Sequence, residues 1–143
     1  MENENRIIGE ILIDTDTTIY FIDQSRPITG GRQQVQLLIL VPLKPRESHF
    51  AGYPDPAGAL REFTSLIGET PVEFQVVKVR NFIAEEQVES TLEGMKEDFI
   101  NSGLDYLKKP NFAGNCIRKK YEALRKEEAI RRAHSEAVKT ARG

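Results

Sequence analysis

The run at residues 35–41 (VQLLILV) is the most apolar stretch of the chain, and it constrains the fold more than any other feature. Turn-forming residues bound it, because Thr29–Gly31 precede it and Pro42 follows it. A run of about four to eight aliphatic residues between such boundaries is typical of a strand rather than a helix. Residues 37–41 show no polar alternation, so both faces of this strand must be covered, with helices on at least one side.

Other segments carry weaker but readable patterns. Two strands joined by a polar turn are predicted before the apolar run, and in the first of them Ile7 and Ile11 are expected on one face. Asp55 and Pro56 suit an N-cap and a first helical position. The predicted strands are residues 6–14, 18–22, 35–41 and 72–79, and the predicted helices are residues 56–67, 85–109 and 113 or 114 to the end.

These segments predict an α+β fold in the order strand-strand-strand-helix-strand-helix-helix. We expect a mostly antiparallel four-stranded sheet with helices on one face and a projecting basic C-terminal helix. Residues 1–112 would form a compact α+β body, and residues 113–143 would form the basic helix of the same domain. A length of 143 residues suits one domain of this kind.

The composition indicates the cellular compartment of the protein and whether it enters a membrane. Cys116 is the one cysteine, so the chain has no internal disulfide, which is compatible with a reducing cytosol. The first residues are polar and acidic, and no run approaches the ~18 apolar residues of a membrane span. We therefore expect a cytoplasmic protein that does not enter a membrane.

Charge is strongly segregated along the chain. Residues 108–143 hold eleven Lys and Arg against four Glu, a net charge of +7, whereas residues 1–107 carry −9. Such asymmetry indicates either a basic tail for an acidic partner or an acidic body onto which the basic helix folds back. The sequence leaves both interpretations open.

Catalytic and metal-binding patterns are weak. His49 and His134 lie far apart, and no Cys/His spacing typical of a metal site is present. Cys116 directly precedes an apolar position near a helix start, which favours a packed thiol over a nucleophile. Asp14 and Asp16 suit a polar hairpin turn better than a magnesium site. We predict no catalytic residue, no metal ligand and no cofactor, and the sequence favours a non-enzymatic role.

The proline-rich loop at residues 46–53 (RESHFAGY) is the first candidate site, because it concentrates aromatic, basic and polar side chains. A ligand pocket could form between this loop and residues 26–32. The alternative is a loop whose aromatic rings fold back to cover the sheet. The candidate ligand-binding residues are Arg32, Arg46, His49, Phe50 and Tyr53.

The basic C-terminal helix is the second candidate site. Its cations recur about every seven residues, so part of the charge falls on one side of a helix and could follow phosphates. The alternative is a solvated helix with internal pairs four residues apart, such as Glu122 with Lys126 and Glu127 with Arg131. The candidate partner-binding residues are Arg118, Lys119, Lys120, Arg125, Arg131 and Arg132.

These observations favour a binding module that acts through the basic helix and the loop on nucleic acid or on an acidic protein surface. The alternative function is a small-molecule or nucleotide-binding protein, with or without catalytic activity, that has a site under the loop at residues 46–53. The sparse apolar positions beyond Leu124 suit burial on a second subunit, so we also expect a homodimer.

Overall fold

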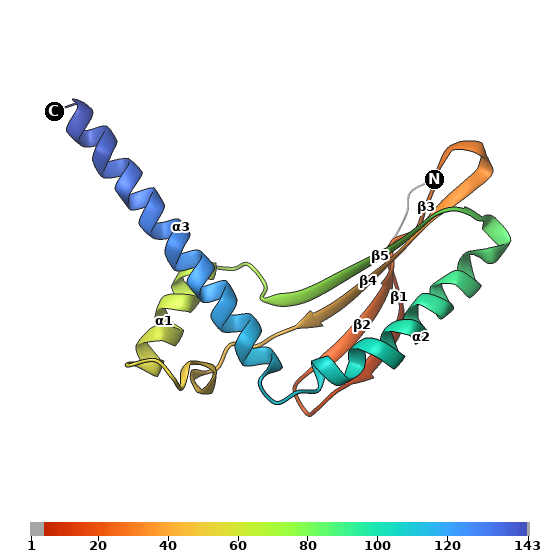
Figure 1. Ribbon diagram of the computed structural model, residues 1–143, viewed down its shortest axis with the longest axis horizontal. Coiled ribbons are helices and arrows are strands. Elements are labelled where there is room, and N and C mark those ends of the chain that lie inside the picture. The colour runs from red at the N-terminus through yellow and green to blue at the C-terminus, as the bar shows by residue number, and fades with distance from the viewer. Residues whose placement is uncertain (1–4, 143) are drawn as a thin grey trace. The chain divides into compact units, whose positions relative to one another are not determined.

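The computed structural model describes residues 5–142 and shows an α+β fold with an open antiparallel sheet and three α-helices, which confirms the expected fold class (Figure 1). Contacts group the chain into two compact units. The sheet unit comprises Met1–Leu43 and Glu73–Pro110, and the helical unit comprises Lys44–Val72 and Asn111–Gly143. The expected assignment of residues 1–112 and 113–143 to one domain stays a prediction.

The sheet is built around one long central strand. The strands are β1 (Arg6–Leu12), β2 (Thr18–Asp23), β3 (Arg26–Pro27), β4 (Arg32–Pro42) and β5 (Glu73–Ala84). Strand β4 pairs with β2 and β3 along one edge and with β5 along the other, always antiparallel. Four strands were expected. The additional strand, β3, has two residues, and it pairs with β4 along the same edge as β2.

The core of the sheet unit lies on one face of β4. Val35, Leu37, Ile39 and Val41 are fully buried there, whereas the intervening leucines are half-buried on the other face. Helix α2 (Val88–Leu107) runs along the sheet (Figure 1) and buries Leu92, Met95 and Phe99. The ring centroids of Phe21 on β2 and Phe99 on α2 lie 6.0 Å apart in an edge-to-face contact. Burial against this helix is the main apolar contribution to stability in the sheet unit.

Strand β1 contains an irregularity that the sequence pattern did not reveal. Ile7 was expected on the same face as Ile11, but the register shifts between Ile7 and Gly9. Ile7 pairs with Ile22 and Gly9 pairs with Phe21, so these two β1 residues point to opposite faces. The Ile7 side chain is consequently 56% exposed, and that prediction was wrong.

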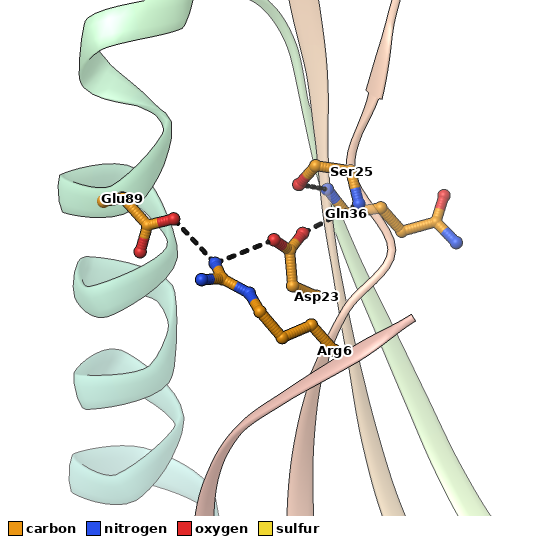
Figure 2. Close-up of polar contacts among 5 residues, drawn as sticks. All are labelled: Arg6, Asp23, Ser25, Gln36 and Glu89. Atoms are coloured by element: carbon orange, nitrogen blue, oxygen red, sulfur yellow. Dashed lines mark hydrogen bonds and ion pairs between the residues drawn. The ribbon is translucent and has the colours of Figure 1, made fainter. Parts of the chain in front are cut away.

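A polar cluster ties the start of the sheet to helix α2 (Figure 2). Nη2 of Arg6 lies 3.2 Å from Oδ2 of Asp23 and 2.6 Å from Oε1 of Glu89. Asp23 also accepts a hydrogen bond from the backbone N–H of Ser25, whose hydroxyl accepts one from the backbone N–H of Gln36. The cluster therefore joins β1, β2, β4 and α2, although exposed ion pairs of this kind contribute about 1 kcal/mol or less.

Strand β5 extends five residues beyond the predicted end at Val79. Near its end Phe82 has a φ of 60°, and no other non-glycine residue that the structure describes has a positive φ. The Phe82 side chain is 68% exposed, so burial does not compensate for this backbone conformation.

We predict that Phe82→Gly raises the free energy of unfolding by about 1 kcal/mol, because glycine adopts a positive φ without a Cβ clash. Phe82→Ala is the matched control, since it removes the ring but keeps the strain, and it should change stability by less than about 0.5 kcal/mol. Urea denaturation of both variants measures the difference. Equal stability of the two variants would contradict strain at this position.

Helix α2 and the 3₁₀ turn before it (Glu85–Gln87) occupy most of the predicted helix at residues 85–109. The helix continues without a break through Gly103. A Cβ at Gly103 would lie 2.7 Å from the Phe99 ring, so the glycine leaves room for a core aromatic one turn earlier.

The helical unit contains a short 3₁₀ turn, η2 (Glu47–Phe50), and helices α1 (Pro56–Ile67) and α3 (Phe112–Arg142). Helix α1 has the predicted bounds. The Asp55 side chain caps it by accepting a hydrogen bond of 3.1 Å from the backbone N–H of Gly58. Gly68 ends it with a φ of 59°, a left-handed conformation that favours glycine.

Candidate functional site

Four aromatic rings hold the helical unit together. Phe50 is fully buried, and its ring centroid lies 5.6 Å from that of Tyr53, 6.0 Å from Phe63 and 5.4 Å from Tyr121. We call these four residues the aromatic cluster. Phe63 comes from α1 and Tyr121 from α3, so the loop at residues 46–53 is packed onto both helices. The alternative expectation for this loop placed its aromatic residues over the sheet, whereas these ring contacts are made with helices.

Two carboxylates satisfy the hydroxyl groups of the aromatic cluster. Tyr53 donates a hydrogen bond of 2.5 Å to Glu122, and Tyr121 donates one of 2.7 Å to Glu62. Burial, and then the bond to Glu62, raise the pKa of Tyr121 to about 12. Burial and the bond to Glu122 also raise the pKa of Tyr53. Both phenols therefore stay protonated at neutral pH and act as hydrogen-bond donors.

His49 has a structural place in the loop. Its Nδ1 accepts a hydrogen bond of 3.0 Å from the backbone N–H of Arg46, which requires that nitrogen to be unprotonated. Its carbonyl oxygen accepts a bond of 2.6 Å from Nη1 of Arg118 on α3. Burial first, and then the charges of Arg46 and Arg118, lower the pKa of His49 from 6.5.

This pKa predicts a stability loss below neutral pH. Well above pH 6.5, His49 is neutral in both the folded and the unfolded chain. As the pH falls through that value, the unfolded chain binds the proton first, so unfolding becomes more favourable. We expect Tm to fall more for the wild type than for His49→Asn between about pH 8 and about pH 5. Equal losses in the two proteins would contradict a lowered pKa at His49.

Four of the five predicted ligand residues therefore come together in the loop: Arg46, His49, Phe50 and Tyr53. Arg32 lies on β4 in the sheet unit. A shallow hollow of about 350 Å³ lies beside the loop and is lined by Tyr53, Tyr121, Glu62 and Arg125 among others. We call it the tyrosine hollow. Whether the loop residues bind a ligand stays a prediction.

The packing of Phe50 gives a sharp test of the structural role of the loop. We predict that Phe50→Ala lowers the free energy of unfolding by about 3–5 kcal/mol, because it leaves a cavity among three other rings. Tyr53→Phe should cost about 1 kcal/mol or less, since it removes only one partly exposed hydrogen bond. Chemical denaturation measures both variants. A similar small loss for both would show that the loop does not support the aromatic cluster.

The predicted partner-binding residues have several different environments on α3. Arg118 donates to the carbonyl oxygen of His49 in the loop. The Arg125 guanidinium lies 5.1 Å from the centre of the Tyr121 ring, and its nitrogens lie 3.5 Å from Glu62 and 3.4 Å from Glu122. Lys119 and Lys120 are exposed.

The remaining two, Arg131 and Arg132, share one carboxylate. Nη2 of Arg131 lies 2.7 Å from Oε1 of Glu128, and Nε of Arg132 lies 3.1 Å from the same oxygen. The hydrogen bond from Arg131 is the largest of the causes that lower the pKa of Glu128 to about 2. The alternative of a solvated helix paired Arg131 with Glu127, whereas in the structure Arg131 pairs with Glu128.

A second hollow, of about 570 Å³, lies between α1 and α3. We call it the arginine groove. The residues that line it include Arg61, Glu62 and Ser65 from α1, and Arg125, Glu128 and Arg132 from α3. The α1 residues were not predicted from the sequence to be functional. Spacing alone could place Arg118, Arg125 and Arg132 on one face of α3, because they are seven residues apart, but it could not identify the helix opposite.

Other chemistry has little support among the described residues. No group of three or more His, Cys, Asp and Glu side chains within residues 5–142 is placed to hold a metal ion. Cys116 is half-buried, and burial raises the pKa of its thiol, which disfavours the nucleophilic thiolate. Among the helices that the structure describes, none has the length and apolar character needed to cross a membrane.

Comparison with known proteins finds no matching family model, and neither the curated proteins nor the solved structures return a match.

Proposed function

We propose that the chain is a non-enzymatic binding module that engages nucleic acid through the cations of α3. The observation that carries this proposal is the exposure of the helix: every residue from 129 to 141 is exposed. The thirteen residues of this segment would be a marginal helix in water if they were isolated, and exposed internal ion pairs add little to the stability of such a helix. A partner that covers part of this surface would stabilise the helix.

The exposed lysines of α3 supply the charge for such a partner. Lys119, Lys126 and Lys139 have no ion pair within the described part of the chain, in contrast to the arginines that pair with Glu62, Glu122 and Glu128. Lys119 and Lys126 are seven residues apart, so they lie on one side of the helix about 10.5 Å from each other along its axis. Ammonium groups in such a row favour a repeating anion, and the phosphodiester backbone is the commonest one.

Salt-dependent binding tests this function directly. We expect fluorescein-labelled duplex DNA to bind the full chain in anisotropy titrations, with an affinity that falls steeply as salt increases. Replacement of Lys119, Lys120 and Lys126 by Gln should flatten the slope of log K against log salt by about 0.9 for each phosphate that the helix no longer neutralises. The matched control replaces Lys44, Lys78 and Lys108 by Gln, which removes the same charge elsewhere, and it should keep the slope.

Two outcomes would contradict the proposal. The full chain could fail to bind duplex DNA and single-stranded RNA at low salt, or the control could flatten the slope as much as the α3 variant. In the second case net charge, and not the position of the lysines, would explain binding. An acidic protein surface, the other partner class considered, would then be the next candidate for α3, as would a second copy of the chain in a homodimer.

The tyrosine hollow favours a second candidate function, a small-molecule or nucleotide site beside the loop. The residues with polar side chains that line it are Tyr53, Asp55, Glu62, Tyr121 and Arg125. A metabolite panel would raise Tm if a ligand binds there, and Tyr53→Phe should reduce the effect without a large change in the Tm of the free protein.

A further inference from the structure

The arginine groove presents more hydrogen-bond donors than the protein itself uses. Arg61 makes no hydrogen bond or ion pair within residues 5–142, and its side chain lines the groove. Arg132 donates to Glu128 through Nε, and no contact within the described chain uses its two terminal nitrogens. A guanidinium carries five N–H donors in a planar fork. The two arginines therefore leave most of their donors unused at one site.

The carboxylates of the groove are already engaged. Oε1 of Glu62 accepts the hydroxyl of Tyr121 at 2.7 Å and lies 3.5 Å from Nε of Arg125. Glu128 holds two arginines, Arg131 and Arg132, and its pKa is lowered to about 2. Three guanidinium groups and two carboxylates line the groove, so one positive charge is left over. The surplus corresponds to Arg61.

The unused N–H donors and the surplus positive charge indicate an anionic ligand that accepts several hydrogen bonds. Arginine forks match the oxygens of phosphate in a bidentate arrangement, which the compact ammonium group of lysine does not provide. Ser65 lines the same groove, and its hydroxyl has no hydrogen-bond partner within the described chain. The volume of about 570 Å³ is in the range of small-molecule sites and exceeds what one phosphate needs.

We propose that the arginine groove binds a phosphate group, held by Arg61 of α1 and Arg132 of α3. This inference goes beyond the proposed function, because it concerns a discrete site that can bind a small phosphorylated molecule even if α3 binds no polymer. Nucleic acid offers the same phosphate chemistry, so the experiment has to separate the two sources.

The chain provides a matched pair of variants for the test. Arg131 and Arg132 are adjacent, both exposed and both bonded to Glu128, but only Arg132 lines the groove. Inorganic phosphate is titrated into the wild type, Arg132→Gln, Arg131→Gln and Arg61→Gln, with amide shifts followed by NMR and with chloride at equal ionic strength as reference. We expect saturable shifts for the wild type and for Arg131→Gln. Affinity should fall by about tenfold or more for Arg132→Gln and for Arg61→Gln.

Two further titrations distinguish the source of the phosphate. Adenosine monophosphate that binds more tightly than inorganic phosphate, with the same dependence on Arg61 and Arg132, would indicate a small phosphorylated ligand. An oligonucleotide that displaces phosphate from the groove would indicate the backbone of a nucleic acid. Because replacement of Lys119, Lys120 and Lys126 leaves the groove intact, loss of polymer binding and loss of phosphate binding are separate results.

The inference would be overturned if phosphate produced no more shift than chloride in the wild type. It would also be overturned if Arg131→Gln weakened binding as much as Arg132→Gln, because net charge would then explain binding. Circular dichroism and Tm of each variant show whether it is folded, and the exposed positions of all three arginines make unfolding an unexpected result.

Discussion

The sheet unit depends on the pairing of β4 with strands on both of its edges. Ten residues of β4 pair with β5, and the opposite edge is shared by β2 and β3. Because hydrogen-bonded neighbours on both edges fix the orientation of β4, every second residue faces α2. Four of these residues are completely buried. The position of α2 follows from this apolar row, and the Arg6 cluster then joins the end of the sheet to the same helix.

The helical unit depends instead on the packing of one buried aromatic side chain. Phe50 enters between α1 and α3 from a loop, and three rings surround it. Polar groups are arranged around this cluster so that each tyrosine hydroxyl has a carboxylate partner. The chain supplies twelve Lys and Arg against eight Asp and Glu in this unit, so a positive excess remains after the pairs are formed. That excess lies partly on the exposed length of α3 and partly at Arg61, the two places at which we propose that anions bind.

Strong local patterns made much of the fold predictable. The bounds of α1 followed from Asp55, Pro56 and Gly68, and the central strand followed from its apolar run. The β1 irregularity, the added strand β3 and the long end of β5 depend on pairing between strands, which a local pattern does not record. The candidate sites were also predictable only in part, because local spacing identifies residues on one helix but not the residues that face them from another. The arginines of α3 share a face by their spacing, but Arg61 becomes relevant only once α1 is known to lie against α3.

Glu62 and Arg125 line both the tyrosine hollow and the arginine groove, and their ion pair therefore belongs to two cavities at once. A ligand that draws Arg125 toward one cavity changes the charge that Glu62 presents to the other. Thermodynamic linkage then requires the effect to be reciprocal and equal in size for the two ligands. If both hollows bind ligands as proposed, this one exposed ion pair would couple the two binding events within the helical unit.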